Sequence, residues 1–562
     1  MTAFNLLREP WLPVVRADGT RVPIRLRDLA DTEISRIDTG RGDCDIALTE
    51  LLIGLLAIAL DPRLTKAKWT RHWRNPPSAA ELDAAFEPFA KAFDFDGAGA
   101  RFFQDIEDLK GDMTPVAALL IDAPAEHFVK PGSIRVLSRR GAAIVLATLQ
   151  TCAPAGGAGH RTSLRGGGPL TTLVVPGTPN GAPPTLWHRL WANVPENFGA
   201  TPAEITGVFP WLGPTRVSDK ASKTPITTPL DVHKAQAFFG LPRRIRLAFE
   251  PNPDRLPCDL TGDVDDVIVR EYVTKPWGAN YAGWGKEHPL SPSYKPKPSA
   301  AEFLPVHLKT SRVGYRQWLG FVFKPNPNAV DESNPELPAA AISTFYSTRS
   351  GDLLDQDPGS INSARLLVAG YYLDNMKPLE FGESVLPLVQ VPLGLETGSA
   401  QLAHAWVEAA EEAAKALGFA VKQGLYGDNP KIAAGAAVLD NARVRFWGDT
   451  EQAFFTQLPA AISGLASANA TDETASAHRR AVGTSWLEAM RRTALAIFDT
   501  MVPIDTADLK DIDDYKTIVD ARRLLANTFA GLTPSGRKLH ARLDQPEQPK
   551  PKKTDKTKEK AA

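Results

Sequence analysis

The residues best suited to chemistry lie in a glycine-rich run of fourteen residues, from Ala155 to Gly168. Six of them are glycine, and Arg161 and Arg165 lie within the run. Because glycine has no Cβ, its backbone N–H groups can come close to a ligand. Consecutive amides beside arginines suit phosphate groups or a base edge in a DNA groove. Turns also use glycine, so the run alone indicates either a binding loop or a turn.

A second candidate is the basic and aromatic strip from Arg270 to Pro292. Aromatic side chains alternate there with Arg, Lys and Asn, as in Lys275-Pro-Trp-Gly-Ala-Asn280. Bases stack on aromatic rings and phosphates attract cations, so such strips are typical of nucleic-acid contacts. A packed surface loop has the same composition, and this alternative stays open. A third segment, Gly370 to Pro378, has by spacing alone the composition of a turn.

Signatures of common enzymes are absent from the sequence. It contains no GxxxxGK[ST] phosphate loop, no HExxH, no GxSxG and no HxE…CxxC pattern. The three cysteines, Cys44, Cys152 and Cys258, are far apart and form no CxxC pair. The histidines do not pair at metal-ligand spacing with a carboxylate cluster. We therefore expect no catalytic residue, no cofactor and no metal.

The charge balance limits how this chain can bind nucleic acid. It has 64 Lys and Arg against 65 Asp and Glu. A protein that coats nucleic acid through charge alone is strongly basic. Any contact would therefore be local, and other subunits would supply most of the phosphate neutralisation.

Neither a signal peptide nor a membrane span is expected. The N-terminus has no basic region followed by an apolar core. The most apolar run, Ala47 to Leu60, carries Glu50 and is about 14 residues long, whereas a membrane span needs roughly 20. This run predicts a buried helix. Three scattered thiols favour a reducing compartment, and we expect a soluble, cytoplasmic protein with no membrane partner.

The elements that must position these segments follow two patterns. Over residues 1–390, short β-like runs such as 143–146 and 172–175 alternate with helices and loops rich in Pro and Gly. From about residue 391 to 542, apolar residues recur at helical spacing. This rhythm covers 402–417, 432–446, 482–501 and 515–529.

The fold class predicted is α+β. An irregular mixed domain over 1–390 would precede a C-terminal four-helix bundle over 391–542, since four amphipathic helices pack most economically as a bundle. Residues 543–562, rich in Lys and Pro, carry too little apolar surface to order themselves. We predict a disordered tail there.

Several segments, taken together and in order, resemble the CasA family, the large subunit of the type I-E CRISPR Cascade complex. The resemblance covers nearly the whole chain. The matching segments are Phe4 to Val14, Asp112 to Pro115, Leu164 to Thr172, Gly240 to Leu247, Thr274 to Tyr281 with His288 to Pro292, and Gly370 to Lys377.

The resemblance implies a non-catalytic subunit in antiviral defence. Family members read the protospacer-adjacent motif (PAM) in double-stranded target DNA and start strand separation, and the guide CRISPR RNA then pairs to form an R-loop. The implied partners are the other Cascade subunits, the guide RNA, the DNA target and a helicase-nuclease that the subunit helps recruit. One alternative is a protein-binding scaffold subunit without direct PAM readout. Another is an enzyme of the same pathway, for which no motif is present.

Site residues follow from the resemblance residue by residue. The family's glycine loop falls on Gly156, Gly157, Ala158 and Gly159, with its backbone against the minor groove beside the PAM. The family's lysine finger falls on Lys275, with Arg270 as a competitor.

The family's wedge, which splits the first base pairs, falls on Leu373, Asp374, Asn375 and Met376. Asn375 stands where some relatives have glutamine. A loop near Phe128 and Lys130 resembles the one that ties the subunit to the guide-RNA end of the complex.

Metal binding in the N-terminal domain is where this sequence departs from some relatives. Those relatives carry a cysteine cluster that resembles a zinc knuckle, whereas residues 251–263 retain only Cys258. One thiol cannot hold a structural zinc, so the prediction of no metal stands here too.

Overall fold

The structure is a computed structural model that describes most of the chain. The described residues are 3–60, 65–122, 132–157, 159–177, 183–297, 299–310, 312–323, 336–349, 358–391, 394–427, 434–468, 472–503 and 512–546. Contacts divide the chain into two compact units. Unit 1 runs to residue 388, except for Gly314–Leu319, which belongs with the residues from Val389 onward in unit 2.

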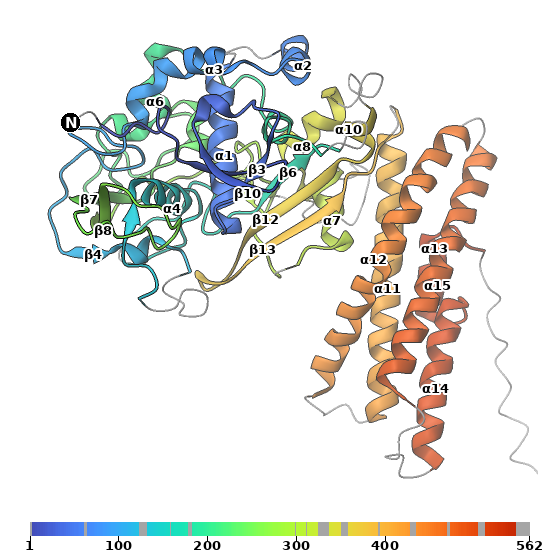
Figure 1. The fold of residues 1–562 in the computed structure, drawn as a ribbon. Helices are drawn as coiled ribbons and strands as arrows, with labels where there is room; N and C mark the ends of the chain where they lie inside the picture. The colour runs from blue at the N-terminus through green and yellow to red at the C-terminus, as the bar shows by residue number, and fades with distance from the viewer. Residues whose placement is uncertain are drawn as a thin grey trace, which may run out of the picture. The chain divides into compact units, whose positions relative to one another are not determined.

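Unit 1 is built around a buried helix, α1 (Gly42–Ala59), drawn in blue in Figure 1. Nearly all of its side chains are buried, as expected of a helix that is apolar on every face. It packs on α4 (Arg139–Cys152) and α5 (Leu186–Trp191). The buried helix predicted at 47–60 is therefore confirmed. Further helices of this part are α2 (Lys66–Arg74), α3 (Ala79–Phe86), α6 (Ile205–Val208), α8 (Ala340–Thr344) and α10 (Pro358–Asn362). The helix α7 (Tyr315–Val322) begins in unit 2 and ends in unit 1.

Two antiparallel sheets carry the candidate segments. In the first, β8 (Val267–Lys275) pairs with β7 (Arg244–Pro251) on one side and with β4 (Met113–Pro115) and β5 (Leu137–Ser138) on the other. In the second, β12 (Arg365–Asp374) lies between β13 (Lys377–Pro387) and β6 (Thr171–Val175). β12 and β13 form a long ribbon (Figure 1).

Two smaller sheets complete unit 1. Their strands are β1 (Leu12–Arg16), β2 (Arg21–Ile24) and β3 (Ile34–Ile37) in order β2-β1-β3, and β9 (Ser293–Tyr294), β10 (Leu304–Pro305) and β11 (Glu336–Leu337) in order β10-β9-β11.

One predicted strand is wrong and another is right. Residues 172–175 lie in β6, as predicted. Residues 143–146 lie instead inside α4. Ser138 begins that helix, because its hydroxyl accepts a hydrogen bond from the Gly141 N–H at 3.1 Å. A short, fully apolar run does not distinguish a buried strand from a buried helix.

Unit 2 is helical. Its long helices are α11 (Glu396–Tyr426), α12 (Ala434–Ala468), α13 (Asp472–Met501) and α14 (Ile512–Phe529). They contain the predicted stretches 402–417, 482–501 and 515–529 and residues 434–446 of the fourth, whose residues 432–433 lie outside the described residues. Aromatic rings fill the core: Trp406 and Trp486 stack at 5.5 Å between ring centroids. The predicted α+β class with C-terminal helices is confirmed.

A fifth helix in unit 2, α15 (Pro534–Arg542), was not expected from the sequence. Pro534 lies in the first turn of this helix, where proline fits. Thr533 caps this turn by accepting a hydrogen bond from the Gly536 N–H at 3.0 Å. Leu543 is buried just after the helix, and Asp544 pairs with Arg479 on α13 at 3.1 Å. Residues 547–562 of the predicted tail lie outside the described residues.

Within the described ranges, no helix combines the length and the apolar character that crossing a bilayer requires.

Candidate nucleic-acid interface

The glycine loop folds as a tight turn at the end of the segment that follows α4. His160 N–H donates to the Gly157 carbonyl at 2.8 Å, and Gly157 and Gly159 have φ of +66° and +85°. These left-handed values favour glycine. Among the described residues, neither glycine N–H has a hydrogen-bond acceptor, and Gly157 is exposed. Ala158 lies outside the described residues.

The glycine loop rests on the residues just after β8. Trp277 N–H donates to the Gly159 carbonyl at 2.8 Å. A Cβ built on Gly159 would lie 2.8 Å from the Trp277 ring, so this close approach also requires glycine. Arg161 lies 5.0 Å from the centre of the same ring and donates to Ser218 Oγ at 2.9 Å. Trp277 itself has φ of +65°, which is strained for a bulky residue and indicates a site held by its neighbours.

Lys275 is the last residue of β8, two residues before Trp277. It is half-buried and, among the described residues, has no carboxylate within ion-pair distance. Its competitor Arg270 pairs with Glu250 at 3.1 Å. Arg270 also lies five residues back along the strand, which is roughly 16 Å at 3.3 Å per residue.

The predicted wedge is the tip of the β12–β13 hairpin. Asp374 pairs with Lys377, and the two residues between them, Asn375 and Met376, have φ of +47° and +64°. Positive φ at both central positions defines a type I′ turn, the tight turn favoured in hairpins. The register shifts between Tyr372 and Leu373, so a bulge lies directly beside the tip.

The glycine-rich run also contacts this hairpin tip. A Cβ built on Gly167 would lie 3.0 Å from Met376 Sδ, and one built on Gly168 would lie 3.1 Å from Leu373 Cδ1. The run from Ala155 to Gly168 thus contacts the end of β8 with its first half and the hairpin with its second. Three segments that are far apart in sequence meet within unit 1.

The arginines of the glycine-rich run do not serve as free phosphate ligands. Arg165 is buried and pairs with Glu50 on α1 at 2.5 Å. It also donates to Ser291 Oγ at 2.7 Å. His288 lies 3.7 Å from Glu50, and burial lowers the pKa of His288, so its ring is neutral. The His288-to-Pro292 element is therefore part of a buried network that supports the site.

The remaining predicted site residues fall elsewhere. Phe128 and Lys130 lie outside the described residues. Cys44, Cys152 and Cys258 are free and buried, and the Cys258 sulfur lies against Gly141 of α4. In the ranges that the structure describes, no group of three His, Cys, Asp or Glu side chains could hold a metal ion.

Sequence reasoning missed two residues that shape the site, Ser218 and Arg243. Ser218 N–H donates to the Trp277 carbonyl at 3.0 Å, and Arg243 lies beneath Gly156. Both come from segments remote from the glycine loop. The only signal for Arg243 was its place in the motif Gly240 to Leu247.

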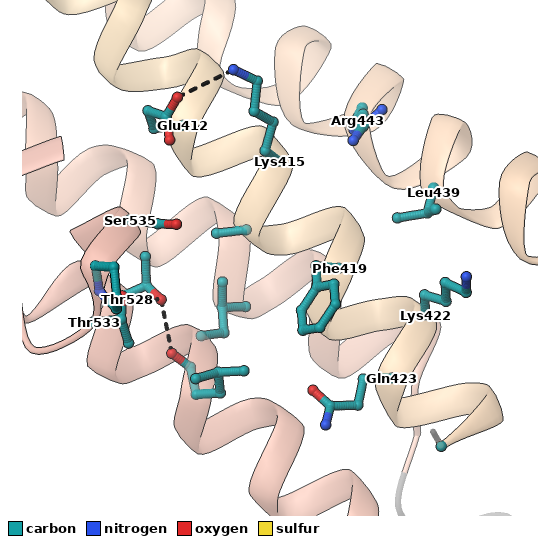
Figure 2. A pocket seen from close by; sticks show the side chains of 15 residues that line it. Glu412, Lys415, Phe419, Lys422, Gln423, Leu439, Arg443, Thr528, Thr533 and Ser535 are labelled. Atoms are coloured by element: carbon teal, nitrogen blue, oxygen red, sulfur yellow. Dashed lines mark hydrogen bonds and ion pairs between the residues drawn. The ribbon is translucent and has the colours of Figure 1, made fainter. Parts of the chain in front are cut away.

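Unit 2 has a groove of its own between α11, α12 and α14 and the start of α15, with a volume of about 760 Å³. Figure 2 shows Phe419 projecting from α11 into this groove, with Lys422 and Arg443 at its margin. Phe419 is 57% exposed at this groove.

Comparison with known proteins shows the family and the fold of this chain. The family model described as CRISPR-associated protein Cse1 matches residues 5–497. The fold is similar to that of CasA from Thermus thermophilus, with a TM-score of 0.68 and 19% identity over 94% of this chain and 100% of that one. Cse1 from Acidimicrobium ferrooxidans gives a TM-score of 0.66 at 20% identity, over 97% of this chain and 99% of that one. Thermobifida fusca Cse1 gives 0.65 at 18% identity, over 96% and 98%.

The family match spans both units and includes all three segments that meet at the glycine loop. On that match, the chain belongs to the Cse1, or CasA, family, the large subunits of type I-E Cascade.

Proposed function

We propose that this chain is the non-catalytic Cascade subunit that reads the PAM in double-stranded DNA and begins strand separation. The observation that carries the proposal is the meeting of three segments. The glycine run contacts Trp277, two residues after Lys275, and also contacts Met376 at the hairpin tip. A motif reader and a wedge must lie side by side, because the base pairs opened first are those next to the motif.

The glycine loop supplies the contact with the motif. Its exposed backbone can enter a groove too narrow for a side chain, and Lys275 adds a cation with no carboxylate to neutralise it among the described residues. The minor groove separates A·T from G·C pairs but little else. Such a reader accepts a small set of motifs and leaves the remaining sequence to guide pairing.

The hairpin tip supplies the wedge. Opening duplex DNA costs roughly 1.4 kcal/mol per base-pair step in lost stacking, so something must fill the gap before guide pairing offsets that cost. Asn375 has an amide that can hydrogen-bond exposed base edges. Met376 is 45% exposed and flexible enough to fill irregular space.

The proposed function implies several partners for this chain. The other Cascade subunits hold it on the complex, and the loop of Phe128 and Lys130 contacts the guide-RNA end. After strand separation, the chain helps recruit the helicase-nuclease that degrades the target.

The direct test is target binding by reconstituted Cascade against a randomised PAM library, with and without this chain. We expect a small set of motifs to be enriched only when the chain is present. Equal recovery of all motifs by both complexes would contradict motif reading.

The wedge is tested by replacing Asp374, Asn375 and Met376 with glycine. We expect slower strand opening on fully paired targets, and near-normal rates on targets whose first few base pairs beside the PAM are already mismatched. The same defect on both targets would show that the hairpin does not act as a wedge.

A scaffold role without PAM readout is the second candidate, and the groove of unit 2 favours it. An exposed Phe419 beside Lys422 suits a segment of another subunit that combines an apolar side chain with carboxylates. Under this function, Phe419→Ser with Lys422→Glu would weaken assembly of Cascade, and Lys275→Ala would leave the binding of every motif unchanged. Loss of motif discrimination in Lys275→Ala would exclude the scaffold role as the main one.

A further inference from the structure

Arg243 lies directly beneath the glycine loop, one residue before β7 begins. Its backbone N–H donates to Gln150 Oε1 of α4 at 3.0 Å, and its Nη2 donates to the Pro154 carbonyl. Its Nη1 lies so close to Gly156 that a Cβ built there would be 2.6 Å away. The guanidinium therefore occupies the space that any side chain at position 156 would take.

Two neighbours explain the glycine at position 156. The backbone of Gly156 does not have a positive φ, unlike that of Gly157 and Gly159. Its conformation is open to any residue, but a Cβ there would lie 2.6 Å from Arg243 Nη1 and 2.9 Å from His160 Cβ of the same turn.

The charge of Arg243 lacks a partner. Among the described residues, no carboxylate lies within ion-pair distance, and neither Nε nor Nη1 has a hydrogen-bond acceptor. Burial lowers the pKa of Arg243 to about 10, so the group stays charged at neutral pH. The neighbouring His160 adds no negative charge, and burial together with Arg243 lowers the pKa of its ring.

Two other buried arginines provide a comparison. Arg165 pairs with Glu50, whereas Arg349, like Arg243, has no carboxylate within ion-pair distance among the described residues, and its Nε has no acceptor. Arg349 is 2% exposed and donates to two carbonyls, those of Ala192 and Val194. Arg243 donates to one carbonyl and is only partly buried, with Nη1 turned toward the exposed glycine loop. Partly burying a cation without an anion is costly, and the cost disappears if an anion arrives from solution.

We propose that Arg243 binds a backbone phosphate of the DNA held against the glycine loop. This inference rests on the proposed function, since it places the duplex at that loop. A phosphodiester oxygen beside Gly156 would accept a charge-assisted hydrogen bond from Nη1. The contact would fix the position of the duplex on the loop and carry no sequence information of its own.

Salt dependence tests the proposal, because a phosphate contact releases counterions when DNA binds. In reconstituted Cascade, Arg243→Gln should weaken binding to every target and reduce the slope of log K against log salt by about 0.9. The difference from wild type should then shrink about 3-fold between 50 and 200 mM salt. The ratio of affinities for correct and incorrect motifs should stay unchanged.

Three further variants separate a phosphate contact from damage to the fold. Arg243→Lys keeps the cation and should keep the slope, whereas Arg8→Gln removes an equal charge from a surface pair with Glu87 and should leave the slope unchanged. Gly156→Ala should displace the guanidinium and reduce the slope as Arg243→Gln does, and the double variant should reduce the slope no further. Partial unfolding lowers the competent fraction alike at every salt concentration, so it does not alter the slope.

The outcomes distinguish this inference from the proposed function. An unchanged slope in Arg243→Gln, with motif discrimination still lost in Lys275→Ala, would overturn the phosphate contact alone. If Arg243→Gln, Lys275→Ala and Arg270→Ala all leave binding to every target unchanged, both the proposed function and the phosphate contact are wrong. A reduced slope in Arg243→Gln, with unchanged discrimination between correct and incorrect motifs in that variant, supports both the phosphate contact and the proposed function.

Discussion

The Glu50–Arg165 pair of unit 1 has side chains that are 3% and 2% exposed, whereas the Arg522–Asp499 pair of unit 2, joined just as closely, is 41% and 47% exposed. The same kind of ion pair thus occupies two different environments. The Glu50–Arg165 pair lies beneath loops that lack a regular hydrogen-bonding pattern. The Arg522–Asp499 pair lies on the outside of helices whose backbone N–H and C=O groups already bond to one another.

The difference shows how each region is held. Unit 1 fixes its loops with buried or partly buried charges, as where Arg139 binds Asp265 at 2.6 Å and Arg244 binds Asp105 at 2.6 Å. Both units pack aromatic rings, with Trp187 stacked on Trp191 at 5.2 Å between centroids in unit 1 and Tyr315 on Phe454 at 4.4 Å in unit 2. The stability of a site built on loops therefore depends on polar contacts that are costly to break. The stability of a helical bundle depends on side chains that fill its core without cavities.

The largest expected effect is on the buried pair. Glu50→Ala leaves Arg165 buried without its anion, and we expect the free energy of unfolding of unit 1 to fall by about 3–5 kcal/mol. Denaturant unfolding followed by hydrogen exchange in α1 and β6 measures it. A loss below about 1 kcal/mol would mean that the buried network does not hold unit 1 together.

The second prediction concerns a carboxyl group of unit 1 that burial keeps from ionising easily. Burial raises the pKa of Asp45 from 3.8 to about 6, although Thr39 donates two hydrogen bonds to its Oδ1. Because the pKa of Asp45 is raised in the folded state, the contribution of its carboxyl group to the free energy of unfolding is complete below pH 3.8 and is lost as the pH rises through 6. Asn at this position accepts the same bonds without a charge.

We therefore expect Asp45→Asn to be more stable than wild type at pH 7, by up to roughly 3 kcal/mol for a difference of about two pKa units. The advantage should vanish near pH 4. Thermal unfolding across this range measures it, and an advantage that does not change with pH would show that ionisation of Asp45 is not the cause.

The third prediction locates the lysine finger. Lys275→Ala should weaken binding to targets with a correct PAM by about 1–3 kcal/mol and to targets with a wrong motif far less. Arg270→Ala is the matched control, since Glu250 already neutralises that cation. Equal losses on both targets would make Lys275 a phosphate contact, and a loss only in Arg270→Ala would move the finger there.

The fourth prediction separates stability from function at the hairpin. Met376 has φ of +64°, a conformation that costs a non-glycine residue roughly 1–2 kcal/mol. Met376→Gly should raise the stability of unit 1 by about 1 kcal/mol while it slows strand opening on fully paired targets. Higher stability with unchanged opening would show that the methionine takes no part in the wedge.

The smallest effect is expected on the surface of unit 2. Asp499→Asn breaks an exposed pair in which Arg522 donates two hydrogen bonds of 2.6 and 2.8 Å. We expect a loss of at most about 1 kcal/mol in the unfolding of the bundle. A loss as large as that of Glu50→Ala would remove the contrast between the two units.

Much of unit 2 could be predicted from the sequence, because a helix repeats its contacts every three to four residues. The described parts of the four stretches lie in α11 to α14. The short helix α15 was missed, since proline fits the first turn of a helix but breaks its middle. Unit 1 was harder. Its apolar run at 143–146 fits either a strand or a helix, and the cap at Ser138 decides it.

The sequence by itself named the candidate segments: the glycine run and the strip from Arg270 to Pro292 by their composition, and the turn at Asn375 by the family resemblance. Composition identifies such segments because glycine and turn residues act locally, through φ and the missing Cβ. Only the tertiary structure decided that these segments meet, that Arg165 is committed to Glu50, and that Arg243 lies beneath Gly156 with no carboxylate partner among the described residues. The reason is physical: an arginine in sequence has one charge, and whether that charge is paired depends on residues brought close by folding.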